Sequence, residues 1–255
     1  MSLVERTFLG IDTSGGREPF CLAALDQECN LVMLDEGDLD RILAILGEQD
    51  IVIAAINGPQ RPNTGLVRRI LEERGHSPGS LRGVDMRMVE YDLRERGISI
   101  SSTPSRKEMC PSWIQFGFAL YAGLAALPDK YTPYPTVNGK RQFMETHPHA
   151  VFCSLLGMPP LPKPTLEGRL QRQLVLHENG LKIIDPMEFF EEITRYRLLQ
   201  GKLPMEFLYT TEQLDALAAA FVAFTAGTLP EKTLMLGDET EGQIVLPVNE
   251  LKEEY

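Results

Sequence analysis

The spacing of hydrophobic positions predicts several strands in the first part of the chain. Residues 7–12 form a short apolar run that ends in a carboxylate, and two further runs follow at residues 20–26 and 30–34. Runs with such short links are typical of a meander of antiparallel hairpins. Residues 51–56 are apolar throughout, which is typical of a strand buried on both faces in a parallel arrangement.

Apolar residues at helical spacing predict helices in most of the remaining chain. We expect a helix at residues 38–48 and a short strand at residues 142–147. Further helices are expected at residues 66–73, 85–96, 111–127, 150–156, 165–177, 186–199 and 211–225, and a last strand pair at 233–236 and 243–246.

This order of elements predicts an α/β fold. Three linked strands come first, and strands separated by helices follow, which must run parallel through right-handed crossovers. We expect a mixed five-stranded sheet of three antiparallel strands and then parallel ones, with residues 7–12 near its centre and helices on its faces. A single domain over residues 1–255 would carry helical insertions at about 60–140 and 150–205.

Composition narrows the class of protein. The 255 residues are 43 % hydrophobic and 24 % charged, which suffices for a sizeable core. No apolar run approaches the roughly 18 residues of a membrane span, and no long apolar segment resembles a signal peptide. The four cysteines are scattered, without a CxxC pair. These features predict a cytoplasmic protein with reduced thiols and no membrane partner.

The net charge of −11 bears on the partner. Proteins that bind nucleic acid usually carry a basic surface, because neutralisation of phosphates dominates their affinity. The charge therefore makes a nucleic-acid partner less expected, unless a local basic strip or bound metal ions hold the polyanion.

Polar residues end three of the predicted strands and suggest a site. These residues are Asp12, Asn57 and Glu145, and ligands bind outside the carboxyl ends of strands in open α/β sheets. Asp215, on the helix expected at residues 211–225, can join them. Gathered carboxylates suit Mg²⁺ or Mn²⁺. Taken singly, such residues are more often turn formers or complements to a helix dipole.

His147 lies two residues after Glu145 in the sequence. In an extended strand both side chains would share a face, so His147 can serve the same site as a ligand, a general acid or an orienter of water. An equally good interpretation is that His147 caps the following helix.

A basic cluster marks the start of the helix expected at residues 165–177. Lys163, Thr165, Arg169 and Arg172 share one face at helical spacing. Beside a helix N-terminus, this face suits a phosphate. The alternative is an ordinary solvated face, which most surface clusters are.

Seven segments in order resemble one known family. They are GIDTSGG (10–16), AAINGP (54–59), ERGISISSTP (95–104), ETHPHAVFCSLLG (145–157), KPTLEGRLQR (163–172), LDALAAAFVAFTAG (214–227) and EGQIVLP (241–247). Nearly the whole chain resembles the domain-of-unknown-function family four-two-nine, described as predicted RNase H-like nucleases. No single segment is specific, but seven in sequence are.

The resemblance implies an RNase H-like fold and a metal-dependent phosphodiesterase site. It implies that Asp12, Glu145 and Asp215 are the acidic site residues, and that the helix start from Lys163 to Arg169 is the basic one. The family usually places a carboxylate where this chain has Asn57. An amide brings no negative charge, which weakens the case for two-metal chemistry.

Three functions follow as hypotheses. The first is a nuclease in which Asp12, Glu145 and Asp215 hold Mg²⁺ or Mn²⁺ and activate water. The second is a nucleotide-binding protein with an actin-like fold, in which the turn containing Ser14 contacts phosphates. The third is a binding protein that has lost catalysis together with the carboxylate at position 57.

Overall fold

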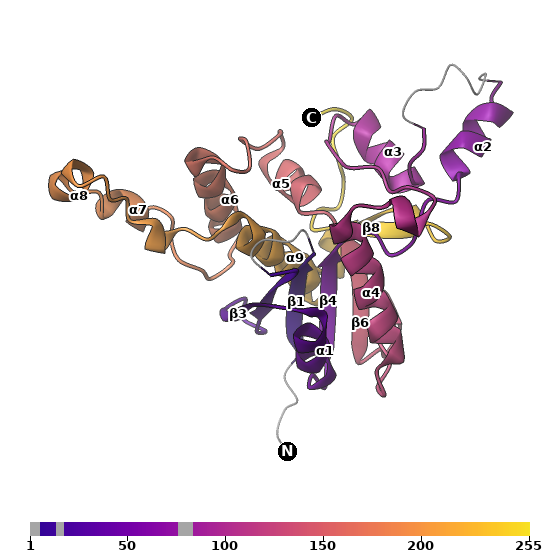
Figure 1. Ribbon diagram of the computed structural model, residues 1–255, viewed down its shortest axis with the longest axis horizontal. Helices are drawn as coiled ribbons and strands as arrows, with labels where there is room; N and C mark the ends of the chain where they lie inside the picture. Colours follow the sequence, from indigo (N-terminus) through magenta and orange to yellow (C-terminus); the bar gives the residue numbers. More distant parts are fainter. Residues whose placement is uncertain (1–5, 14–17, 76–83) are drawn as a thin grey trace.

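A mixed sheet forms the centre of the protein (Figure 1). It is seen in a computed structural model that describes residues 6–13, 18–75 and 84–255. The strand order is β3-β2-β1-β4-β6-β8-β7, with β5 paired to β6 at one side. The strands are β1 (Thr7–Asp12), β2 (Phe20–Leu25), β3 (Leu31–Gly37), β4 (Val52–Asn57), β5 (Thr132–Pro133), β6 (Arg141–Thr146), β7 (Leu234–Asp238) and β8 (Gly242–Leu246).

The pairing agrees with the predicted mixed sheet but not with its size. β1, β2 and β3 form an antiparallel meander, and β1, β4, β6 and β8 run parallel. The described sheet has eight strands rather than five. The extra strands are the short β5 and the hairpin β7–β8, whose strands were expected as a pair but not as part of this sheet. β8 joins β6 at a single register position, Glu145 with Ile244, which no hydrophobic pattern would reveal.

The described part of the chain has nine α-helices. One prediction needs correction: the helix expected at residues 186–199 is broken into α7 and α8. Thr194 caps a new helix there by accepting a hydrogen bond from the Arg197 backbone N–H, so the chain restarts instead of continuing. The helices are α1 (Leu39–Gly47), α2 (Leu66–Glu73), α3 (Met88–Glu95), α4 (Ser112–Ala126), α5 (Pro148–Leu156), α6 (Leu166–Glu178), α7 (Glu188–Glu191), α8 (Arg195–Leu199) and α9 (Thr211–Thr228).

None of the helices in the described ranges has the length and apolar character needed to cross a membrane.

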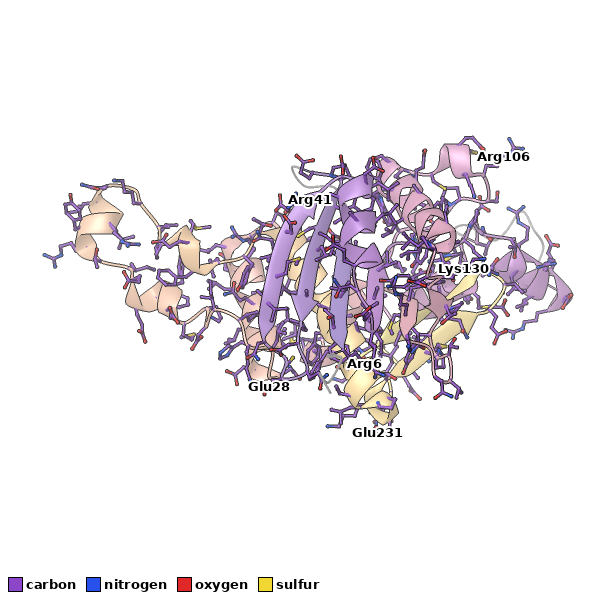
Figure 2. The ribbon with its side chains drawn as sticks, turned by 90° about the horizontal axis from the view of Figure 1, so that it is seen from below. Arg6, Glu28, Arg41, Arg106, Lys130 and Glu231 are labelled. Carbon is purple, nitrogen blue, oxygen red and sulfur yellow. The ribbon has the colours of Figure 1, made fainter. Side chains whose placement is uncertain are left out.

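The sheet separates two hydrophobic cores, so the fold has three layers. Along β1, Phe8 belongs to the core under α9, α5 and α6, whereas Leu9 and Ile11 belong to the core under α1 and α4. Figure 2 shows helices on both sides of the strands. Because side chains alternate across a strand, Gly10 and Asp12 lie on the α9 side.

Helix α9 packs very closely on β1. A Cβ atom at Gly10 would lie 2.0 Å from the carbonyl oxygen of Ala216 and 2.1 Å from the backbone nitrogen of Ala220. The absent side chain of Gly10 and the small alanines of α9 therefore allow backbone-to-backbone approach. The capping box of Thr210 and Gln213 fixes the start of this helix. Asp215 consequently lies beside the carboxyl end of β1.

The segment with α7 and α8 extends away from the sheet (Figure 1). Tyr196 and Leu199 are among its large hydrophobic side chains that are exposed. The site residues predicted from the sequence all lie outside this arm.

Candidate functional site

Asp12 and Asn57 meet at the carboxyl ends of the two central parallel strands. They occupy the same register position of β1 and β4, and Nδ2 of Asn57 donates a hydrogen bond of 2.5 Å to Oδ1 of Asp12. Both side chains are buried. The hydroxyl of Thr13 donates to the carbonyl of Asn57 at 2.7 Å, which holds the two strand ends together. The structure thus confirms that these two strand ends converge.

Asp215 reaches the same place from α9. The pKa of its carboxyl is raised to about 7, first by burial and then by the nearby charge of Asp12, while Lys163 and Arg172 work against the rise. Nζ of Lys163 lies 2.6 Å from Oδ2 of Asp215. Burial opposes the charge of Lys163, but Asp215 outweighs it and raises the pKa of the amine. The buried carboxylates of Asp12 and Asp215 therefore share one site, and the ammonium group of Lys163 pairs with Asp215.

Glu145 does not join these carboxylates. It stands in register with Ile56, one position before Asn57, so its side chain lies on the opposite face of the sheet from those of Asp12 and Asn57. The strand β6 continues to Thr146, which is the residue aligned with Asn57. Thr146 donates its hydroxyl hydrogen to the carbonyl of Val245. The prediction that Glu145 converges with Asp12 and Asn57 was therefore wrong. The residue of β6 aligned with Asn57 comes one position later, and a shift of one residue moves a side chain to the other face of the sheet.

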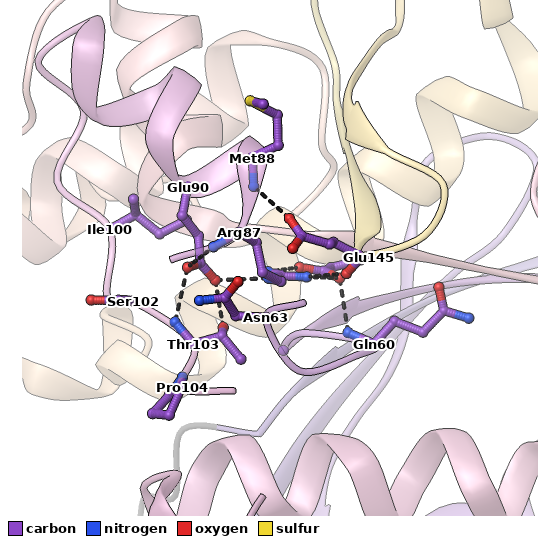
Figure 3. A network of polar contacts seen from close by, with 12 residues as sticks. Gln60, Asn63, Arg87, Met88, Glu90, Ile100, Ser102, Thr103, Pro104 and Glu145 are labelled. Carbon is purple, nitrogen blue, oxygen red and sulfur yellow. Dashed lines mark hydrogen bonds and ion pairs between the residues drawn. The ribbon is translucent and has the colours of Figure 1, made fainter. Parts of the chain in front are cut away.

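Glu145 instead belongs to a buried network around Arg87 (Figure 3). Nη2 and Nη1 of Arg87 lie 2.5 and 2.9 Å from the two carboxylate oxygens of Glu145, and Nε lies 2.8 Å from Glu90. Burial works against the charge of Arg87, but the two glutamates outweigh it and raise its pKa. The backbone N–H of Gln60 also donates to Glu145. Glu145 thus has its charge satisfied by the protein itself.

Most residues of the predicted basic cluster make hydrogen bonds to backbone groups of the protein. Thr165 caps α6 by accepting from the Gly168 N–H. Arg169 donates to the carbonyls of Leu208 and Tyr209 at 3.0 and 2.8 Å. Nη1 of the buried Arg172 donates in the same way to two carbonyl oxygens, of Leu161 and Gly168. Among these four residues, Lys163 is the one that contacts a carboxylate of the site.

Ser14, the predicted phosphate contact in the turn after β1, lies outside the described residues.

A cavity of about 170 Å³ opens beside Asp215 and Lys163. Trp113 of α4 and His147 form part of its wall. The ring nitrogen Nε2 of His147 is enclosed and has no hydrogen-bond partner in the described ranges. The remaining lining residues are Asn57, Ser101, Pro148, His149 and Arg172.

His147 is neutral in this cavity. The pKa of its imidazole is lowered to about 3, first by burial and then by the nearby His149. His147 occupies the residue before α5, but its side chain makes no capping hydrogen bond, so the capping interpretation was wrong. The side chain is available as a neutral hydrogen-bonding group.

Larger cavities lie elsewhere in the described protein and lack this chemistry. One of about 400 Å³ is lined by residues near the amino ends of β4 and β6, including Asp50 and Arg141. Another, of about 620 Å³, lies between β6 and the hairpin β7–β8. Neither is lined by Asp12 or Asp215, so volume alone does not mark the site.

Within the described ranges, no three side chains of the His, Cys, Asp and Glu types are grouped so that they could hold a metal ion. The pair Asp12 and Asp215, with the amide of Asn57, is the acidic part of the site.

The family comparison covers most of the chain, including Asp12, Asn57 and Asp215. A family model described as "Protein of unknown function (DUF429)" matches residues 10–241. The chain belongs to the DUF429 family. No curated protein and no solved structure matches it.

Two residues of this DUF429 site were not expected from the sequence. Trp113 lies in the segment expected as a helix at residues 111–127, and His149 lies two residues after the strand expected at residues 142–147. Their signal was weak: a single Trp in the chain and a His-Pro-His sequence. Only the tertiary contact between α4 and the loop after β6 brings Trp113 to the cavity.

The arrangement can bind an anion or a hydrated cation. The carboxylates attract cations, while the ammonium of Lys163 retains donors for an anionic group, since it has three hydrogens and uses one on Asp215. This combination of charges suits the hydrolysis of a phosphate ester, which needs both kinds of contact.

Proposed function

We propose that this DUF429 protein is a metal-dependent phosphodiesterase of RNase H-like type that acts on nucleic acid. The observation that carries the proposal is the buried pair of Asp12 and Asp215, at the carboxyl end of the central strand and on the long helix packed against it. Perturbed carboxylates in a cleft are candidates for catalysis.

The topology supports the RNase H-like assignment. Its core order β3-β2-β1-β4-β6, with an antiparallel meander followed by parallel strands, is the mixed sheet that the resemblance implies. The four cysteines are free and buried, which supports the cytoplasmic setting expected for them.

The residues present fit one divalent cation better than two. Mg²⁺ is commonly bound through one or two carboxylates together with waters and substrate phosphates, and Asp12 and Asp215 supply such a pair. Glu145 is engaged by Arg87, and Asn57 adds no charge. When bound, the Mg²⁺ or Mn²⁺ would activate water and stabilise negative charge on the phosphate.

The surrounding residues have separate tasks in this proposal. Asn57 orients Asp12 through its amide hydrogen bond. Lys163 compensates Asp215 and offers its remaining hydrogens to a substrate phosphate. His147, neutral and without a partner for Nε2 in the described chain, accepts a hydrogen bond from the substrate.

Cleavage of labelled single- and double-stranded oligonucleotides in Mg²⁺ and in Mn²⁺ tests the proposal. We expect Asp12→Asn and Asp215→Asn each to reduce the rate by about 100-fold or more, as loss of one electrostatic contact to a transition state does. Asp40→Asn, on an exposed position of α1, is the matched control and should cleave as the wild type. Absence of cleavage in both metals, or equal cleavage by Asp12→Asn, would contradict it.

A second candidate is a nucleotide- or ligand-binding protein that has lost catalysis. It is favoured by the way the protein satisfies its own site, because Asn57 donates to Asp12 and Lys163 pairs with Asp215. A site neutralised in this way needs no cation for stability.

The substitution Asn57→Asp separates the two candidates. A third carboxylate beside Asp12 should raise affinity for Mg²⁺ or Mn²⁺ and destabilise the metal-free protein, because like charges repel. Calorimetric metal titration and the cleavage assay are run together. A higher metal affinity with faster cleavage supports the phosphodiesterase, and a higher affinity without cleavage supports the binding protein. Unchanged metal affinity would place position 57 outside any metal site.

A further inference from the structure

We propose that the cavity beside Asp215 is a base-binding pocket, which takes one unstacked base of a nucleotide against Trp113 and His147 and places its phosphate on Lys163. The inference rests on the proposed function for its choice of ligand. It adds the substrate class: a single-stranded or terminal nucleotide, with a single-ring base preferred.

The size of the cavity sets the size of the ligand. Its volume is about 170 Å³, and a cavity of roughly 150 Å³ holds one benzene ring. One pyrimidine ring matches this volume more closely than the two fused rings of a purine. A base pair does not fit, so the base must leave its stack before it enters.

The wall offers the two contacts by which proteins hold single bases. Trp113 lines the cavity with an aromatic side chain, and bases of single strands stack on such rings. His147 supplies a polar contact. Its ring donates to the backbone of Ser99, while Nε2 is enclosed and has no partner in the described residues. Nε2 is therefore a buried acceptor facing no donor, which the N–H of a pyrimidine base would satisfy.

The charge at the cavity differs from that of the whole chain. Its lining includes two cations, Lys163 and Arg172, and one carboxyl, Asp215, whereas the chain carries a net charge of −11. The side chain of Lys163 is 39 % exposed, and Nη1 of Arg172 is occupied by carbonyl oxygens. Lys163 is thus the residue placed to receive the phosphate.

The same contrast argues against a long duplex as ligand. A protein that follows duplex DNA gains affinity by neutralising many phosphates, and an acidic protein repels such a polyanion at long range. A single nucleotide needs one local cation.

The single tryptophan of the chain reports directly on this pocket. Trp113 fluorescence is measured in the full-length protein with a chelator present, so that no cleavage occurs, while uridine monophosphate, adenosine monophosphate or ribose 5-phosphate is added. We expect saturable quenching by the uridine nucleotide, weaker binding of the adenosine nucleotide and no quenching by ribose 5-phosphate. Calorimetry with the same three probes detects binding that leaves the fluorescence unchanged.

Two variants and one control locate the contacts. Lys163→Gln should lower the affinity for uridine monophosphate at least about tenfold, because a charge-assisted hydrogen bond is lost. His147→Leu places an apolar side chain that lacks the acceptor at this position. It should weaken the binding of uridine monophosphate without changing the affinity for inorganic phosphate. Lys130→Gln, at an exposed lysine beside a different cavity, should bind as the wild type.

The outcomes separate this inference from the proposed function. Equal binding of ribose 5-phosphate and uridine monophosphate, or no binding of any probe by fluorescence and calorimetry, overturns the base pocket. Equal or tighter binding of the adenosine nucleotide overturns the preference for a single ring. Nucleotide binding without oligonucleotide cleavage leaves the pocket standing and rejects the phosphodiesterase, and cleavage without nucleotide binding does the reverse.

Discussion

At the scale of single residues, Asp215 is the most perturbed group of the site. It is only 6 % exposed, and it lies near a second buried carboxylate, Asp12. Water would lower the energy of the charged form, but the packing of α9 on β1 excludes it. Lys163 compensates part of this cost through its contact of 2.6 Å. The carboxyl of Asp215 therefore keeps its proton to a higher pH than an exposed aspartate does.

This environment makes the stability of the protein depend on pH. The pKa of Asp215 is about 7 in the folded protein and 3.8 in an unperturbed chain, so the folded state binds more protons between these values. The free energy of unfolding must then fall as pH rises from about 4 to 7, and this contribution levels off above that range.

We expect Asp215→Asn to remove this pH dependence. Relative to the wild type, the free energy of unfolding of the variant should rise by up to about 4 kcal/mol between pH 4 and pH 8, because the buried charge is gone. Urea denaturation across this pH range measures it, with Asp40→Asn as the exposed control. Parallel profiles for Asp215→Asn and the wild type would show that Asp215 is not held protonated by burial.

The residues of the site were partly predictable from the sequence. Asp12 and Asn57 end apolar runs, and Asp215 follows a capping signal, so all three could be placed by local patterns. Glu145 could not be placed in this way. When a strand extends by one residue, the side chain at its end lies on the other face of the sheet, and no local pattern fixes where β6 ends. The buried Arg87 that binds Glu145 comes from a distant helix start, which only the folded chain reveals.

At the scale of elements, the contact between α9 and β1 positions the site. Gly10 leaves room for the helix backbone, and a Cβ atom there would approach the Ala216 carbonyl oxygen to 2.0 Å. Backbone atoms cannot rotate away as the end of a flexible side chain can. Any side chain at position 10 must push α9 outward and carry Asp215 with it.

Gly10→Ala should therefore destabilise the protein by at least about 3 kcal/mol through overpacking, as measured by urea denaturation. The matched control is Gly47→Ala at the end of α1, where the nearest atom to a new Cβ is a Leu127 methyl carbon at 3.9 Å. It should remain within about 1 kcal/mol of the wild type. If Gly10→Ala were as stable as this control, α9 would not pack closely on β1.

The elements themselves followed the hydrophobic pattern well. The meander, the buried strand β4 and the helix α9 are marked by long, regular apolar runs. The break between α7 and α8 was not expected, because a threonine disfavours a helix interior only mildly, whereas Thr194 acts here as a cap. The two-residue strand β5 lies in a loop rich in proline and is too short for any periodicity.

At the scale of the whole molecule, the Arg87 network joins segments that are distant in the sequence. Arg87 begins α3, Glu145 belongs to β6, and Glu90 binds the backbone N–H of Thr103 at 2.8 Å (Figure 3). Glu241, beside the hairpin β7–β8, accepts a hydrogen bond from the Met88 N–H. The network thus holds the segment with Ser101 that lines the cavity. Sequence periodicity does not reveal such a network, because its members share no local pattern.

Arg87 is the cation that balances the two glutamates of this network. Replacing Arg87 with Met keeps much of the side-chain volume but leaves Glu90 and Glu145 without their cation. Loss of one partner from a buried ion pair costs about 3–5 kcal/mol. We expect Arg87→Met to lose stability in that range at pH 8.

The loss of stability in Arg87→Met should depend on pH, and an ion pair at the surface provides the control. Protonation of Glu145 should relieve part of the loss at pH 5, because burial already works to raise the pKa of Glu145 and Arg87 no longer opposes it. Arg41 makes a contact of 2.6 Å with Asp35 at the surface, where its side chain is 58 % exposed. Arg41→Met should therefore lose less than about 1 kcal/mol at either pH. If urea denaturation gives the two variants equal losses, the stability of this region does not depend on the buried charges, and packing around Arg87 must hold the cavity wall instead.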